Sequence, residues 1–205
     1  MSFQNIINYA ETISVSCRKK VSQTVARDGT VRTTSLGGQV WQFEIQLPNG
    51  ISWQTMRPII QGIEALDRTT VGLIQFNKSG QEWLAGYQGN ISNLSGVTVN
   101  FNPTNGANIL TIVSGATVGT GQFRFRAGDL IQLGNGGVYT VVGDVTNSTN
   151  SFAVNRPIRD AAGNHTLKIG SNCVFNVICT QLPQWTIFQR NQVSWNGPFV
   201  LVESI

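Results

Sequence analysis

The side chains best suited to catalysis are sparse in this chain of 205 residues. Its one histidine, His165, lies in Gly163-Asn164-His165-Thr166, a segment with the composition of a turn. A Ser-His-Asp triad would need this histidine as its general base, and placement in a surface loop is the more ordinary explanation. The cysteines lack the Cys-x-x-Cys spacing of a thiolate metal site; they are Cys17, Cys173 and Cys179. We therefore predict no catalytic residue, no metal and no cofactor.

The cysteine spacing also bears on redox state. Cys173 and Cys179 lie in one strand-like run, and a continuous strand would separate them by roughly 20 Å, which is beyond disulfide reach. The N-terminus lacks the basic and apolar regions of a signal peptide, and no apolar run is as long as a membrane span. These features predict free thiols, folding in a reducing cytoplasm and no membrane segment.

Two other patterns could be taken for active-site elements. The run Gly134-Asn135-Gly136-Gly137 has no following Lys-Ser/Thr and no helix, so it predicts a hairpin turn and not a phosphate loop. A glycosidase needs two facing acids, and acidic residues number only ten. An enzyme that degrades cell wall or capsule stays open as an alternative, because pairing in space is not visible in a sequence.

Aromatic residues suggest binding more than catalysis. In Phe123-Arg124-Phe125-Arg126, a strand would place both phenylalanines on one face and both arginines on the other, so they would not bind a nucleic acid jointly. Trp83, Tyr87 and Trp185 could stack on sugars or anchor an interface, because Trp and Tyr offer large rigid surfaces. A carbohydrate-binding module is therefore a second alternative.

Composition favours a protein that buries its exterior against partners. Hydrophobic residues make up 40% and charged residues 12%, about half of the usual charged fraction. A surface with so little charge keeps monomers apart poorly. The net charge of +4 is only mildly basic, and the basic residues are scattered except for Arg18-Lys19-Lys20, so nucleic-acid binding is weakly indicated.

The chain must be mainly β, since Val, Ile, Thr and Phe runs alternate with Gly- and Asn-rich breaks. The segment from about 22 to 34 is too polar to line a core, and Asp28-Gly29 at its centre is a strong signal for a type I′ hairpin turn. We predict a projecting hairpin that a partner surface holds, because an isolated hairpin is marginal in water. Its candidate oligomer contacts are Val25, Ala26, Arg27, Asp28, Gly29, Thr30, Val31 and Arg32.

One flanking α-helix is predicted over about 52–67, capped by Ser52 and with Pro58 tolerated near its start. Its apolar stripe comprises Met56, Ile59, Ile60, Ile63 and Leu66. From residue 94 to 170 the strands become short, which predicts a small inserted β-barrel. Residues 1–93 and 171–205 would then form the main β domain, a sandwich or barrel.

The C-terminal half carries a family resemblance. Its motifs are Phe125-Arg126-Ala127-Gly128-Asp129-Leu130-Ile131-Gln132-Leu133-Gly134, Val138-Tyr139-Thr140-Val141-Val142, Asn155-Arg156-Pro157-Ile158 and Ser194-Trp195-Asn196-Gly197-Pro198-Phe199. With Trp41-Gln42-Phe43-Glu44 and Gly72-Leu73-Ile74-Gln75-Phe76 upstream, residues 40–205 resemble bacteriophage minor tail proteins of the distal-tail or baseplate-hub kind. The versions in contractile-tailed phages of cyanobacteria are the most similar.

The resemblance implies a structural virion protein with a tail-tube-like fold and no active site. Copies of it would form a ring, typically hexameric, that connects the tail tube to the host-facing tip. The implied partners are sister subunits and neighbouring tube, baseplate and hub proteins, with phage DNA passing through the lumen. The protein would be assembled in the host bacterial cytoplasm and reside at the tail tip of the virion.

Overall fold

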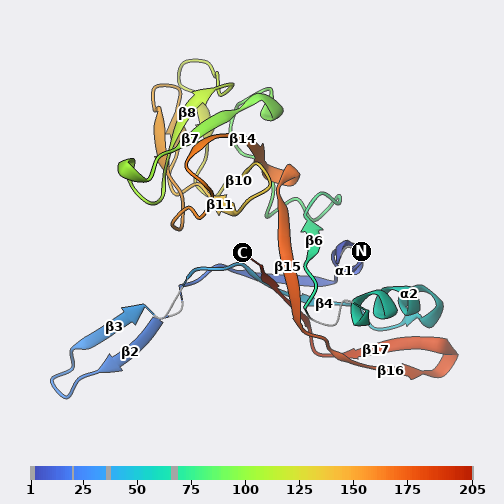
Figure 1. Cartoon of the computed structure of the whole chain (residues 1–205). Helices are drawn as coiled ribbons and strands as arrows, with labels where there is room; N and C mark the ends of the chain where they lie inside the picture. Colours follow the sequence, from blue (N-terminus) through green and yellow to red (C-terminus); the bar gives the residue numbers. More distant parts are fainter. Residues whose placement is uncertain (1–2, 20, 36–37, 66–68, 205) are drawn as a thin grey trace. The chain divides into compact units, whose positions relative to one another are not determined.

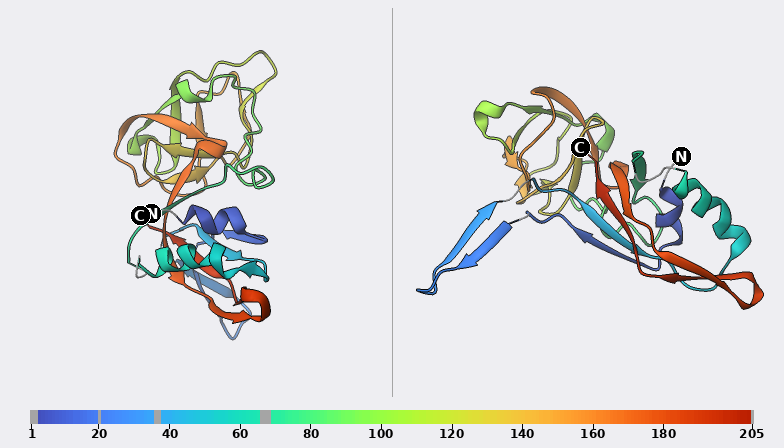
Figure 2. Two further views of the ribbon diagram at one scale, coloured as in Figure 1. Left: turned by 90° about the vertical axis from the view of Figure 1, so that its right-hand side faces the viewer. Right: turned by 60° about the horizontal axis from the view of Figure 1, so that its bottom comes forward.

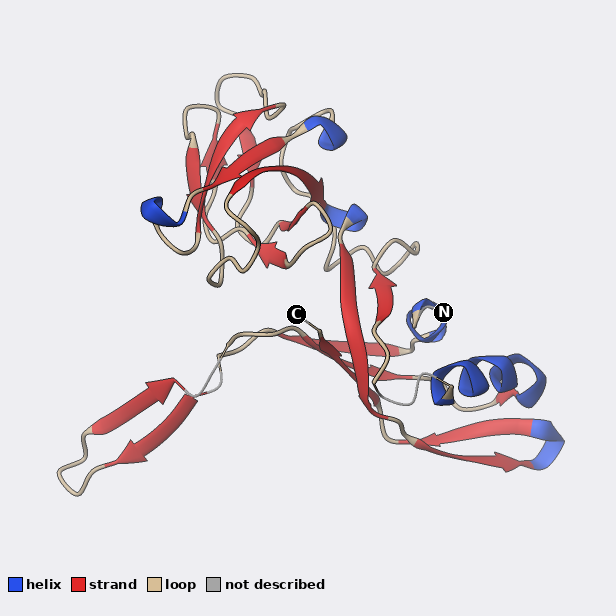
Figure 3. Ribbon diagram, viewed as in Figure 1, coloured by secondary structure: helices blue, strands red, loops and turns tan. Residues whose placement is uncertain are grey.

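Strands dominate the computed structural model, which describes residues 3–19, 21–35, 38–65 and 69–204 (Figures 1 and 3). The prediction of a mainly β protein is confirmed. The prediction of one helix is wrong, because a short helix α1, Gln4–Tyr9, precedes α2, Trp53–Glu64. Helix α1 lacks the length that makes a 3.6-residue pattern readable, but Phe3, Ile6 and Ile7 are fully buried.

The chain divides into two units. The first comprises Met1–Leu73 and Asn176–Ile205, and the second comprises Ile74–Phe175. The second unit begins earlier than the predicted residue 94 because the segment before that residue contributes side chains to its core. Ile91 is part of the second unit's hydrophobic core, and Tyr87 packs against that core.

The main sheet of the first unit has the order β1-β4-β18-β15-β6. The strands β6 and β15 also carry the chain into and out of the second unit. Their bounds are β1 Thr12–Ser16, β4 Gln42–Gln46, β18 Phe199–Glu203, β15 Val174–Gln181 and β6 Gly72–Gln75. Along β4 and its neighbour β18 the alternating side chains Phe43, Ile45, Phe199 and Leu201 are fully buried, as the period of two predicts.

Helix α2 begins where the sequence predicts. The Ser52 hydroxyl accepts a hydrogen bond from the Thr55 amide, 3.3 Å away, and Met56, Ile60 and Ile63 are buried. The predicted stripe residue Leu66 and the predicted end at Asp67 lie outside the described residues. A second sheet of this unit has the order β16-β17-β5, with β16 Gln184–Phe188, β17 Gln192–Asn196 and β5 Ile51–Ser52.

The second unit is built on a six-stranded curled sheet of order β11-β10-β14-β7-β8-β13, whose strands curve around a shared interior (Figure 2). Its outer strands meet at one end, where the Val142 amide donates to Ala153 and the Asn155 amide donates to Thr140, each over 3.0 Å. The strands are β7 Thr98–Phe101, β8 Ile109–Ser114, β10 Leu130–Leu133, β11 Val138–Thr140, β13 Ser151–Ala153 and β14 Gly163–Ile169. This curled sheet is the part of the small-barrel prediction that the structure shows.

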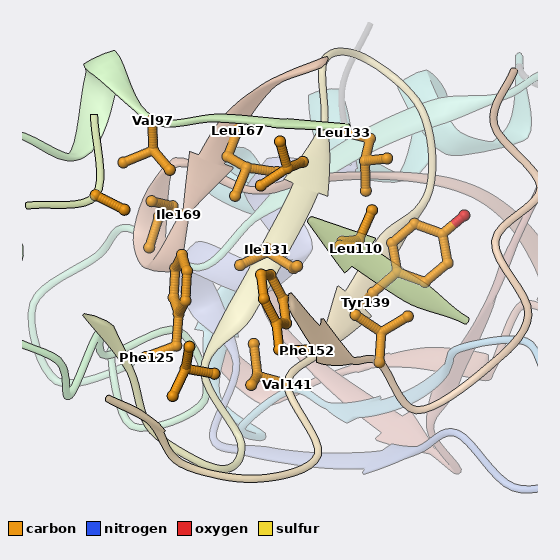
Figure 4. Close-up of a cluster of buried hydrophobic side chains, with 14 of the residues drawn as sticks. Val97, Leu110, Phe125, Ile131, Leu133, Tyr139, Val141, Phe152, Leu167 and Ile169 are labelled. Carbon is orange, nitrogen blue, oxygen red and sulfur yellow. The ribbon is translucent and has the colours of Figure 1, made fainter. Parts of the chain in front are cut away.

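The core of the second unit lies inside this sheet (Figure 4). A separate pair of strands, β9 Phe123–Phe125 and β12 Val145–Thr146, contributes Phe125 and Val145 to it. The Phe125 and Phe152 rings lie 5.2 Å apart. Burial of 17 residues in one cluster gives the inserted unit a hydrophobic core of its own.

Candidate functional site

The predicted hairpin forms from β2, Val21–Val25, and β3, Val31–Ser35, which pair only with each other among the described residues. The two strands run antiparallel and are joined by a short turn (Figure 2). The turn is not the predicted type I′. Ala26 and Thr30 enclose a three-residue loop through an amide-to-carbonyl bond of 2.8 Å, and of Arg27, Asp28 and Gly29 only Gly29 has positive φ. This geometry is a three-residue loop closed by a glycine bulge.

Asp28 stabilises this loop with its side chain. Its carboxylate accepts a hydrogen bond of 2.9 Å from the Thr30 amide, and that bond holds the pKa of Asp28 below its ordinary value. Asp28-Gly29 therefore predicted the hairpin correctly but its turn type wrongly. A type I′ turn needs two residues with positive φ, and in this loop only Gly29 has one.

The three valines of the hairpin lie on one face, the valine face, which also carries Gln23 and Thr33. Val25 and Val31 are directly opposed, so both lie on the face that also carries Val21. Val25 is 68% and Val31 57% exposed. Thr24 and Arg32 are paired on the other face. Both faces are exposed to solvent from residue 21 to 34 except at half-buried Ala26, so neither face of this ribbon is packed against the rest of the chain.

Both outer edges of the hairpin offer unpaired backbone groups. Since Ala26 bonds to Thr30, the alternation of an antiparallel ladder turns the amides and carbonyls of Val25, Gln23, Val31 and Thr33 outward. Such edges add readily to another strand. The ribbon can therefore bind a partner by backbone hydrogen bonding and by burial of its valine face.

The excess charge of the protein is concentrated in the segment that runs from just after β1 into this hairpin. Five of the fourteen basic residues and one of the ten acidic residues lie between Arg18 and Arg32, so this segment carries the whole formal net charge of +4. Arg18, Lys19, Arg27 and Arg32 are exposed and make no ion pair within the part of the chain that the structure describes. A complementary partner surface should be acidic.

A further open edge in the first unit could not be predicted from the sequence. Strand β1 is one of the two outermost strands of its sheet, β6 being the other, and no further strand lies beside it among the described residues. Its burial alternates between exposed Thr12, Ser14 and Ser16 and half-buried Ile13 and Val15. The alternation was visible in the sequence, but which strand would form an edge depends on long-range pairing.

His165 lies in a strand and not in the predicted turn. It belongs to β14, pairs with Val99, and its Nε2 lies 2.8 Å from the Ala161 carbonyl oxygen. No group of three or more metal-binding side chains occurs in the described residues. The cysteines Cys17, Cys173 and Cys179 are free thiols.

The glycine run 134–137 forms the predicted turn between β10 and β11. Asp160 binds this turn. Its carboxylate accepts hydrogen bonds from the Gly137 amide at 3.2 Å and from the Tyr139 hydroxyl at 2.6 Å. A Cβ on Gly136 would lie 1.5 Å from an Asp160 oxygen, so the glycine makes room for the carboxylate. The role of this run is structural.

The Phe123–Arg126 segment departs from the predicted alternation. Strand β9 ends at Phe125, and the Arg126 guanidinium lies 3.6 Å from the centre of the Phe123 ring. Arg126 also forms an ion pair of 3.0 Å with Asp144, while Arg124 donates to the Thr149 carbonyl. Contacts within the unit therefore occupy both arginines.

Asp129 explains much of the Phe125–Gly134 motif. It is 1% exposed, and its two oxygens accept from the Gln88 amide at 2.9 Å and the Arg126 amide at 2.7 Å. Burial raises the pKa of this carboxyl, and the two amides partly oppose the shift. The motif thus specifies a turn bonded to the segment that enters the unit.

The three aromatic residues predicted to bind a sugar or a partner, Trp83, Tyr87 and Trp185, differ in their surroundings. Tyr87 donates to the Arg124 carbonyl at 2.5 Å and accepts from the Ile91 amide at 2.9 Å, so it is structural. Trp185 stacks on Trp53 with 4.9 Å between ring centres. Trp83 is 61% exposed and is the one of the three whose surface is open for binding.

A scan against protein-family models finds no match for this chain, and a search of curated proteins finds no match either. None of the helices in the described residues is long and apolar enough to span a membrane.

Proposed function

We propose that this chain is a structural subunit that assembles into a ring through its hairpin of residues 21–35, at the distal end of a bacteriophage tail. The observation that carries the assembly is the hairpin itself, a ribbon with an exposed valine face and two open edges. Isolated two-stranded ribbons are marginally stable, so a partner strand would stabilise it.

A closed ring is the arrangement that uses such edges without uncontrolled aggregation. Each copy donates one edge and accepts one edge, and a head-to-tail contact terminates when the rotation closes. The low charged fraction of 12% suits a surface that sister subunits cover.

The placement in a phage tail is supported by the resemblance of residues 40–205 to distal-tail and baseplate-hub proteins. In that setting the ring joins the tail tube to the baseplate and hub, and DNA passes through its lumen during ejection. The subunit is assembled in the bacterial cytoplasm and remains in the virion. It performs no catalysis.

Deletion of residues 24–33 tests this function. The deletion removes only exposed or half-buried residues, so far-UV circular dichroism and the urea midpoint should stay at the wild-type values. Assembly, measured by light scattering with and without the tail partners, should be lost. Normal assembly of the deleted protein would refute the role of the hairpin.

Carbohydrate binding is a second candidate because Trp83 is so exposed. A glycan array would show binding that the Trp83→Ala variant loses, while Trp185→Ala serves as a control whose ring is already stacked on Trp53. Absence of binding by the wild-type protein would remove this candidate.

A further inference from the structure

We infer that the surface which receives the hairpin is the open β1 edge of a second copy, to which strand β3 adds in antiparallel orientation. This inference rests on the proposed assembly and names its acceptor. Both elements belong to the first unit, and each is unpaired along one edge among the described residues.

The backbone groups at the β1 edge can be assigned from the neighbouring strands. The Glu203 amide of β18 donates to the Trp41 carbonyl. Successive residues of an antiparallel strand direct their backbone amides and carbonyls to opposite sides. The odd-numbered residues of β4 therefore direct these groups toward β18, and its even-numbered residues, including Glu44, direct theirs toward β1. Along β1 it follows that Ile13 and Val15 direct their amides and carbonyls outward.

The outward groups of β3 match this pattern. Val31 and Thr33 direct their backbone groups away from β2, as the Ala26–Thr30 bond requires. An antiparallel register that pairs Val31 with Val15 and Thr33 with Ile13 satisfies both edges with hydrogen-bonded pairs. Paired residues share a face of the sheet, so the valine face of the hairpin extends the apolar face of β1.

The polar faces match as well. The same register places Arg32 beside Ser14, and Ser14 lies opposite Glu44 within the copy that receives the strand. Two strand spacings amount to about 10 Å, which the long arginine and glutamate side chains can bridge across the small serine. Glu44 is exposed and the exposed Glu11 immediately precedes β1, so acidic side chains lie beside the proposed place of Arg32 and before the strand, whereas the exposed Arg18 and Lys19 follow its other end.

The charge also selects β3 over β2. The sequence of β2, Val-Ser-Gln-Thr-Val, has no charged residue, whereas β3 carries Arg32. Arg32 has no ion-pair partner in its own copy among the described residues. The strand that presents this unpaired charge is therefore the one that Glu44 attracts.

A charge exchange in the full chain tests the contact. Arg32→Glu and Glu44→Arg should each weaken self-association by roughly tenfold, because each places like charges side by side. The double variant should recover most of the loss, and Glu82→Arg, at an exposed glutamate of the other unit, should have no effect. A double variant as weak as the two single variants combined would overturn the inference.

Cysteine cross-linking tests the register directly. In a Cys17→Ser background, Ser14→Cys protein is mixed with Arg32→Cys protein and oxidised. This pair would lie at a Cα separation of about 4.5 Å, within disulfide range, so a covalent dimer of one copy of each should form. Thr12→Cys mixed with Arg32→Cys is the control, displaced by two residues, and should cross-link far less.

The outcomes separate the acceptor from the assembly. If light scattering shows assembly but the Ser14–Arg32 pair cross-links no better than the control, the β1 edge is the wrong acceptor and ring formation still holds. If wild-type protein does not assemble alone or with tail partners, the proposed function fails and this inference fails with it.

Discussion

Replacing Tyr139 by phenylalanine should destabilise the inserted unit strongly while leaving its packing volume almost unchanged. The ring is 1% exposed. Its hydroxyl donates to Asp160 over 2.6 Å and accepts from the Arg159 amide over 3.0 Å. A hydrogen bond to a charged group contributes about 1.5–3 kcal/mol, and an orphaned buried donor costs about 1–3 kcal/mol. Allowing for partial relaxation, the variant should lose roughly 2–4 kcal/mol of unfolding free energy.

Urea unfolding of the full chain, followed by circular dichroism, measures this loss as a lower midpoint. Tyr9→Phe is the matched control, because Tyr9 is an exposed tyrosine whose hydroxyl makes no hydrogen bond within the part of the chain that the structure describes. A Tyr139→Phe midpoint equal to that of Tyr9→Phe would refute the view that the Tyr139–Asp160 bond joins β11 to the segment after β13.

Three further outcomes follow from the second unit and the thiols. Gly115→Ala should destabilise by several kcal/mol more than Gly128→Ala in urea unfolding: both glycines have positive φ, but only at Gly115 would a Cβ meet a backbone oxygen, 2.0 Å away at Gly96. Burial raises the pKa of Tyr87 to about 12, above its unfolded value of about 10, so its stabilising contribution is present below pH 10 and is lost as the pH rises toward 12. Tyr87→Phe should flatten that part of the stability–pH curve. Burial also raises the pKa of Cys173 to about 12, so iodoacetamide at pH 8 should label half-exposed Cys17 before Cys173 in the native protein, as read by mass spectrometry.

Local patterns predicted the local elements. Alternation in Trp41–Leu47, the Ser52 cap and the Asp28-Gly29 turn signal each depend on interactions within a few residues, and the structure has a strand, a capped helix and a hairpin at those places. The turn type escaped prediction because a three-residue loop and a two-residue loop both favour Asp-Gly.

The features that could not be predicted from the sequence depend on contacts between residues far apart in the chain. The boundary between the two units, at residues 73 and 74, depends on Ile91 and Tyr87 reaching the core of the second unit. His165 is a strand residue because it pairs with Val99, 66 positions earlier in the chain. The candidate acceptor edge was hidden for the same reason, because only the completed sheet shows that β1 is one of its two outermost strands.

The most direct measurement is the sedimentation mass of a Gln23→Pro/Thr33→Pro double variant beside that of the wild-type chain. Proline at these positions removes amides that point outward, so the hairpin keeps its internal hydrogen bonds while both outer edges are blocked. The wild-type protein should sediment as a multiple of its 22.3 kDa mass and the variant as a monomer. A variant that assembles to the same mass as the wild type would contradict hairpin-mediated assembly.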